Sequence, residues 1–230
     1  MNMKTLVTTL QLSALVLALN ATLDGDTVAS ILERMDKAAP EFHAMTADVQ
    51  MVTFTAILSD TTTEKGTLKM QRLKANNVRA ILDFSAQTDS SRVIAFLGKT
   101  VRIYYPPEHS YQDYELGKSS QALNQFLLLG FGSSGTDLAR SYEITPEGSD
   151  DVGGKSSTKL LLVPKDPKVK ERLTKIDVWI PNDAAYPVQQ QFFEPSGNYR
   201  KVTYTNIQLN PPIQGTLELK LPSGVTKQSQ

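Results

Sequence analysis

From Met45 onward, the sequence is mostly a succession of short segments rich in Val, Ile, Thr, Phe and Tyr, separated by stretches typical of turns. These residue types are typical of β-strands. About 10–11 such segments at short spacing favour an antiparallel meander, sandwich or barrel, and no repeat or linker divides them. The predicted strands are "MTADVQMVTFTAILS", "GTLKMQRLK", "NVRAILDFS", "SRVIAFLG", "TVRIYYP", "HSYQDYELG", "SYEITPEG", "STKLLLVPK", "LTKIDVWIP", the hairpin "YPVQQQFFEPSGNYRKVTYTNIQLN" and "GTLELKLPSG".

Several of these strands are apolar on both faces. In residues 92–98, Val93 and Ala95 face one way, whereas Ile94 and Phe96 face the other. An antiparallel sheet with one wet face alternates more cleanly. Two arrangements therefore remain open: a closed sandwich core, or a curved sheet whose apolar concave side lies under helices. The second leaves room for an acyl chain, whose burial contributes about 0.8 kcal/mol per methylene.

Two segments have helical character. Residues 27–39 have apolar positions at helical spacing, with Asp26 as the expected N-cap and Pro40 beyond the end. Residues 119–135 concentrate apolar side chains in a window too short to cross a membrane. This window fits either a core helix that closes one end of a barrel or a mobile lid, Gln121–Phe131, over a ligand cavity. Glycines at 130, 132 and 135 permit a hinge.

The N-terminus has the order of a secretory signal. One positive charge in "MNMK" precedes an apolar stretch from Leu6 to Leu19, and the chain then turns polar after Ala21. We expect residues 1–21 to be a signal peptide and residues 22–230 to form a single exported, soluble domain in the periplasm. The alternative is an uncleaved anchor or a buried N-terminal helix.

Composition argues against several functions. The 24 basic and 24 acidic side chains balance, so no global charge favours nucleic acid. There is no Cys, and the two histidines, His43 and His109, stand beside no evident partner. Residues 149–157 end in Gly-Lys-Ser but have Ser149 where a phosphate-binding loop needs its first glycine. We expect no catalytic residues, no metal and no cofactor, and hence no enzyme.

Arg72 is a charged residue on the apolar face of its predicted strand. The pleat places Leu68, Met70 and Arg72 on the same side. Either Arg72 ends the strand and its guanidinium reaches solvent, or the guanidinium is a buried anchor that needs carbonyl or carboxylate partners.

Much of the chain after residue 22 resembles the LolA-type periplasmic lipoprotein carriers and outer-membrane lipoprotein-sorting proteins. The segments that carry the resemblance occur in family order. They are "ILERMDKAAPEFHAMTADVQMVTF", "GTLKMQRL", "GKTVRIYYPPEHSY" and "KIDVWIPNDAAYPVQQQFFEPSGNYRKVTYTNIQLNPPIQGTLELKLPSGV".

The resemblance implies a mainly β protein with helices (α+β): an incomplete, curved antiparallel β-barrel of about 10–11 strands, with helices covering an apolar concave face. It implies a monomer that binds acyl chains of lipoproteins, or another lipid. The chain would take them from an inner-membrane donor complex to an outer-membrane acceptor. An envelope sensor or a structural protein-binding module on the same fold is the alternative.

The resemblance also assigns candidate site residues. Carriers of this family have an arginine at the end of the second strand that helps to hold the lid closed, followed by proline. Arg72 matches that position, and Leu73 stands in place of the proline. The full set expected at the lipid cavity or its lid is Leu68, Met70, Arg72, Phe126, Leu127, Leu129 and Phe131.

Overall fold

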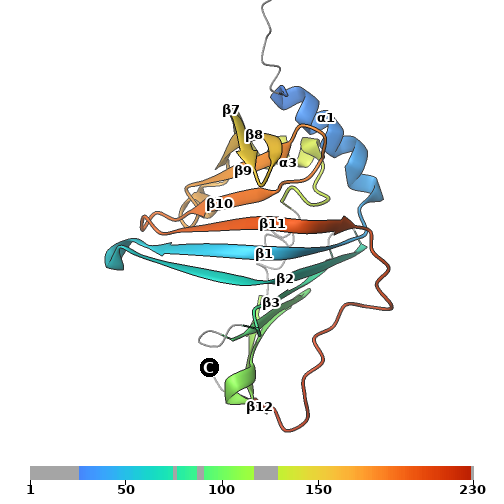
Figure 1. Cartoon of the computed structure of the whole chain (residues 1–230), viewed down its shortest axis with the longest axis vertical. Helices are drawn as coiled ribbons and strands as arrows, with labels where there is room; N and C mark the ends of the chain where they lie inside the picture. Colours follow the sequence, from blue (N-terminus) through green and yellow to red (C-terminus); the bar gives the residue numbers. More distant parts are fainter. Residues whose placement is uncertain (1–25, 75–76, 87–90, 117–128, 229–230) are drawn as a thin grey trace, which may run out of the picture.

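In a computed structural model, which describes residues 26–74, 77–86, 91–116 and 129–228, one sheet of twelve strands dominates the chain (Figure 1). The strand order is β12-β6-β5-β4-β3-β2-β1-β11-β10-β9-β8-β7, and the two edge strands do not pair with each other. All neighbours are antiparallel except β12, which runs parallel to β6. The predicted incomplete, curved antiparallel barrel is therefore confirmed. The strands are β1 Ala44–Thr55, β2 Asp60–Lys74, β3 Asn77–Asp83, β4 Val93–Leu97, β5 Thr100–Tyr105, β6 Ser110–Glu115, β7 Tyr142–Val152, β8 Lys155–Pro164, β9 Lys175–Pro181, β10 Gln189–Phe193, β11 Tyr199–Leu209 and β12 Thr226–Lys227.

Short helices accompany the sheet. Two of them, α1 and α3, lie together at the β7–β10 side of the molecule (Figure 1). The helices of the described residues are α1 Val28–Ala38, α3 Gly135–Ser141 and α4 Pro167–Lys170, with 3₁₀ turns η1 Ala39–Glu41, η2 Ala56–Leu58 and η3 Pro106–Glu108.

The centre of the sheet is the long β1–β2 hairpin. Its two strands pair without a shift from Ala44 opposite Gln71 to Thr55 opposite Asp60. Directly opposed residues of an antiparallel pair share a face. The hairpin therefore places Met45, Ala47 and Val49 beside the apolar residues of β2. We call this side of the sheet the inner face.

The two hydrophobic clusters found among the described residues lie on this inner face. The first joins β1, β2 and β3 with Phe42 and Phe131. The second joins β8 and β9 with α1 and α3. Register connects them across the sheet: Met51 is opposite Val202, Val202 opposite Gln190, and Gln190 opposite Val178. One continuous apolar surface thus runs from β3 to β8.

Helix α1 begins one residue later than expected. Thr27, not Asp26, is its N-cap, because the Thr27 hydroxyl accepts a hydrogen bond from the Ser30 amide. Asp26 instead forms an ion pair with Arg34 at 2.6 Å. Ile31 and Met35 of the same helix are buried in the second cluster.

The predicted strand at residues 215–224 is wrong. This part of the chain is irregular and crosses the outer side of the sheet before β12. Its backbone is bonded by side chains rather than by a neighbouring strand: Gln71 bonds Gly215 and Leu217, and Arg79 donates to the Leu217 carbonyl. Leu217 is buried against that side of the sheet.

The predicted helical window at residues 119–135 lies mostly outside the described residues. From Leu129 to Gly132 the chain forms turns, not helix. A helix that the sequence did not indicate, α3, follows directly. Ser134 caps it by accepting a hydrogen bond from the Asp137 amide, and Leu138 anchors it in the second cluster.

Gly135 determines how closely α3 approaches α1. A Cβ atom at this position would lie 2.2 Å from the Leu32 carbonyl oxygen. We expect Gly135→Ala to lower the free energy of unfolding by about 1–3 kcal/mol, because the helices must separate. Arg140→Ala, at an exposed position of the same helix, is the control and should change it by less than about 1 kcal/mol. Urea denaturation measures both, and equal effects of the two substitutions would contradict the close-packing explanation.

Candidate functional site: an apolar cavity closed by Phe131

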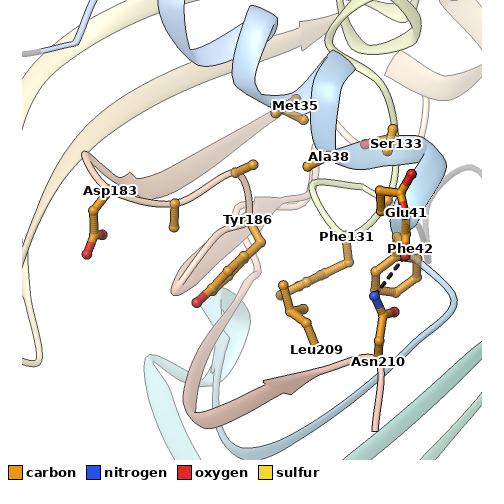
Figure 2. A pocket seen from close by; sticks show the side chains of 14 residues that line it. Met35, Ala38, Glu41, Phe42, Phe131, Ser133, Asp183, Tyr186, Leu209 and Asn210 are labelled. Atoms are coloured by element: carbon orange, nitrogen blue, oxygen red, sulfur yellow. Dashed lines mark hydrogen bonds between the residues drawn. The ribbon is translucent and has the colours of Figure 1, made fainter.

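A cavity of about 250 Å³ lies where the end of α1 meets the end of β11. Figure 2 shows side chains from several separate parts of the chain around it. Its volume is just below the roughly 300–1,000 Å³ of typical small-molecule sites. The lining is predominantly apolar, with few charged groups at the rim. The lining residues are Met35, Ala38, Ala39, Glu41, Phe42, Phe131, Gly132, Ser133, Asp183, Ala184, Ala185, Tyr186, Leu209 and Asn210.

Phe131 forms the boundary between this cavity and the core of the inner face. Its ring packs edge-on against Tyr204, with centroids 5.0 Å apart, and parallel to Tyr186 at 6.4 Å. Only 2% of Phe131 is exposed. Two residues earlier, Leu129 is buried in the helix-side cluster. We call Leu129–Ser134 the plug segment, because it fills the space between the two clusters.

Arg72 holds the plug segment from one side. Its Nη1 donates to the Ala39 carbonyl at 2.8 Å, and its Nη2 donates to the Gly132 carbonyl. The guanidinium also lies over the Phe42 ring, 5.2 Å from the centroid. Burial lowers the pKa of Arg72, yet an arginine stays charged near neutral pH. Of the two alternatives for Arg72, the structure shows the second: the guanidinium is partly buried and bonded to backbone carbonyls.

Gln190 holds the plug segment from the other side. Its amide donates to the Leu129 carbonyl at 2.9 Å, and its carbonyl accepts from the Tyr204 hydroxyl at 2.7 Å. Gln190 is 3% exposed. Burial raises the pKa of Tyr204 far above its ordinary value, so the hydroxyl remains a donor. Sequence reasoning missed this pair, although a glutamine between Val188 and Phe192 on one strand face is a detectable signal.

The plug segment fits only with glycine at two positions. Gly132 has φ +79°, and a Cβ there would lie 2.3 Å from the Phe42 ring. Gly130 has φ +77°, and its Cβ would lie 2.7 Å from Pro187. Both are left-handed conformations that favour glycine. The backbone is therefore pressed directly against Phe42, which lines the cavity, and against Pro187.

Asn210 fixes the rim. Its Oδ1 accepts from the amides of His43 and Ala44, and its Nδ2 donates to the Glu41 carbonyl at 2.8 Å, drawn as the dashed line in Figure 2. Asn210 itself is left-handed, with φ 52°. This side chain ties the end of β11 to the start of β1, so the cavity mouth has a rigid border.

The predicted site residues are only partly brought together. Leu68 and Met70 are buried in the inner-face core, 5% and 2% exposed, and do not line the cavity. Of the predicted set, Phe131 lines the cavity, Arg72 bonds the plug segment beside it, and Leu129 is buried in the second cluster. Phe126 and Leu127 lie outside the described residues. The cavity-lining residues that the sequence did not indicate come from α1, the 183–186 loop and β11.

The described part of the chain offers little support for a metal site, a phosphate-binding loop or a membrane-spanning helix. No group of three or more His, Asp or Glu side chains there could hold a metal ion. The Gly-Lys-Ser segment is a hairpin turn between β7 and β8, and Asp150 accepts a hydrogen bond from the Trp179 indole. No helix in the described ranges has both the length and the apolar character needed to cross a bilayer.

Solved structures share this architecture. An uncharacterized conserved protein from Thermus thermophilus aligns with a TM-score of 0.50 at 13% identity, over 88% of this chain and 98% of its own. A putative outer membrane lipoprotein-sorting protein domain from Vibrio parahaemolyticus gives 0.43 at 12% identity, over 81% and 92%. The Mycobacterium tuberculosis lipoprotein LppX gives 0.48 at 14% identity, over 82% and 99%. No family model matches the sequence, and no curated protein does either.

At these identities the likeness shows the fold alone. The chain has an open, curved antiparallel sheet with helices on its inner face, and it shares this fold with the Thermus thermophilus protein.

Removal of the Arg72 guanidinium should loosen the plug segment. Arg72→Met keeps an apolar stem but leaves two carbonyls without their donor, so we expect the free energy of unfolding to fall by about 1–3 kcal/mol. Amide hydrogen exchange at residues 130–134 should become faster. Arg79→Met is the matched control, because Arg79 bonds a carbonyl on the other side of the sheet. Unchanged exchange in Arg72→Met would show that Arg72 does not hold the plug.

The two anchors of the plug segment should be energetically coupled. Once one is lost, the plug opens more readily, and loss of the second costs less. We expect the double variant Arg72→Met/Gln190→Leu to be at least about 0.5 kcal/mol more stable than the sum of the single effects implies. Chemical denaturation of the four proteins measures this coupling. Strict additivity would mean that the anchors act on separate structural units.

Proposed function

We propose that this chain is a non-catalytic carrier of acyl chains. It binds the acyl chains of lipoproteins, or another lipid, against its inner face and delivers them to the outer membrane. In this proposal residues 1–21 are a signal peptide, and residues 22–230 act in the periplasm as one domain and as a monomer. An inner-membrane complex would supply the cargo, and an outer-membrane acceptor would take it.

The observation that carries the proposal is the construction of the inner face. A soluble domain normally fills such a face with side chains fixed by packing. Here the middle is occupied by a segment of turns that inserts one aromatic ring, Phe131, beside an existing cavity. An acyl chain that displaced this ring would exchange one set of apolar contacts for another. The net cost of opening is therefore small compared with that of exposing a core.

The hydrogen bonds from Arg72 and Gln190 hold the plug segment in one defined position when no acyl chain has displaced Phe131. Plug release would break the bonds from Arg72 to Gly132 and from Gln190 to Leu129. Each bond contributes only about 0.5–3 kcal/mol net. Burial of a few methylenes at about 0.8 kcal/mol each offsets that loss. A carrier needs this near balance, because it must release its cargo as readily as it binds it.

One observation favours the alternative, an envelope sensor or a structural protein-binding module on the same fold. The closed cavity, about 250 Å³, is small, and Phe131 already packs well against Tyr186 and Tyr204. A protein that never opens its plug would have this appearance as well. Whether lipid is bound therefore separates the two functions.

The decisive experiment is mass spectrometry of lipid extracted from protein purified without detergent. We expect stoichiometric acyl lipid on the wild type. Ala185→Trp places an indole in the cavity, and overpacking of about 1–3 kcal/mol corresponds to roughly a 5- to 150-fold loss of affinity, so less lipid should copurify. Ala185→Ser, at the same position, should load normally. A lipid-free wild type that also fails to take up added phospholipid would refute the carrier function.

A further inference from the structure

The turn between β1 and β2 exposes two large apolar side chains to solvent. Ile57 is 91% exposed and Leu58 is 71% exposed. The next most exposed large apolar residue among those described is Leu209, at 46%. Both residues lie in η2 at the end of the longest hairpin, and Figure 1 shows this turn projecting beyond the neighbouring β10–β11 turn. We call Ala56–Ser59 the tip.

The tip is built to stay exposed. The β1–β2 pairing continues without a shift as far as Thr55 opposite Asp60. The Ser59 amide donates to the Ala56 carbonyl at 3.1 Å, and Ser59 is left-handed with φ 51°. From the side, the Ala56 amide donates to the Asn198 side chain at 2.9 Å. A turn held this firmly cannot fold Ile57 and Leu58 back onto the protein.

Behind the tip, aromatic rings cross the outer side of the sheet. Phe54 stacks on Tyr199 with centroids 5.1 Å apart, and Tyr199 lies 6.0 Å from Phe193. Lys175 continues this row, with its Nζ 4.4 Å from the centroid of Phe193. Lys201 lies two residues beyond Tyr199 on the same strand face. The apolar tip is therefore followed by a row of aromatic rings that ends in Lys175, and Lys201 lies one step further from the tip.

We propose that the tip inserts into the surface of a lipid bilayer that contains anionic headgroups. Apolar side chains that enter the acyl region, aromatic rings at headgroup depth and lysines toward the phosphates are the arrangement that membrane interfaces favour. The acidic groups at this edge, Asp60 and Glu194, oppose anionic lipid only in part, because Arg200 lies 3.6 Å from Glu194.

A narrow convex tip suits a bilayer better than a protein partner. A stable protein–protein interface buries about 800 Å² on each side, and its centre is flat or interlocking. Two side chains at the end of a hairpin offer much less area. A bilayer requires no complementary shape. This inference does not depend on the proposed function, because the tip lies at the opposite end of β1 from the cavity.

Flotation with vesicles tests the proposal. Vesicles of phosphatidylethanolamine and phosphatidylglycerol are compared with vesicles of phosphatidylcholine alone. We expect the full chain to bind both, and the anionic vesicles more tightly. Ile57→Ser/Leu58→Ser should weaken binding roughly ten-fold for each side chain removed. The control Leu73→Ser/Tyr114→Ser removes two other exposed apolar side chains, 36% and 39% exposed, and should bind like the wild type.

A probe at the tip separates its contribution from that of the apolar N-terminus, residues 6–19, which every variant shares. The chain has no cysteine, so Ser59→Cys can be labelled with the fluorophore NBD at a single position. We expect a blue shift on binding and quenching by spin-labelled lipid.

Three results would overturn the proposal: a wild type that does not float, a tip variant that floats as well as the control, or a floating protein whose NBD emission keeps its value in water. A concentration-dependent dimer that the tip variant abolishes, with vesicle binding unchanged, would identify the tip as a contact between protein chains.

Discussion

The register of the β1–β2 hairpin is the constraint on which the rest of the structure depends. Twelve opposed pairs, from Ala44–Gln71 to Thr55–Asp60, place every second residue of both strands on the inner face. A slip of one residue would turn Met45, Ala47 and Val49 to solvent and bring Asp48 and Gln50 inward. It would also move Arg72 away from the end of α1. The position of the guanidinium between two carbonyls is therefore a consequence of strand pairing several residues away.

Because the strand register fixes where Arg72 and its partners lie, the apolar inner face can tolerate buried polar groups. Arg72, Gln190 and Tyr204 lie around a space that otherwise consists of hydrocarbon, where an unpaired polar group is costly. Each bonds the backbone of the plug segment, or the side chain that does so. With the plug segment in place, both Arg72 Nη atoms, the Gln190 amide and the Tyr204 hydroxyl have hydrogen-bond partners, whereas the buried Arg72 Nε has none. Polar anchors give the plug one defined position, whereas apolar packing alone would tolerate several.

The sequence predicted what local periodicity controls. Alternation gave the strands and the shared face of Leu68, Met70 and Arg72, because a side-chain period of two is a property of single strands. It also predicted a strand at residues 215–224, where the chain is irregular and pairs with no neighbouring strand. Pairing depends on a partner, and Gln71 bonds this backbone instead.

Features that depend on tertiary contact escaped prediction. Helix α3 has only seven residues and begins at a glycine, so it gains stability from docking on α1 rather than from its own sequence. The bond from Tyr204 to Gln190 joins two neighbouring strands, and the pattern around Gln190 does not show which residue of the neighbouring strand it will bond. The cavity draws its lining from α1, η1, the plug segment, the 183–186 loop and β11. Only the folded chain brings these together.

The two ends of β1 have different chemical character, and this separation has a consequence for a carrier. The strand begins beside the cavity and ends at the tip, eleven residue steps away, which is about 36 Å at 3.3 Å per residue. A protein anchored by Ile57 and Leu58 would hold its cavity well outside the hydrocarbon of that bilayer. Contact between the tip and lipid would then leave the bonds from Arg72 and Gln190 to the plug intact. If both proposals hold, attachment to a membrane and opening of the cavity would be separate events, and a contact at the α1 end of the sheet would have to release the plug.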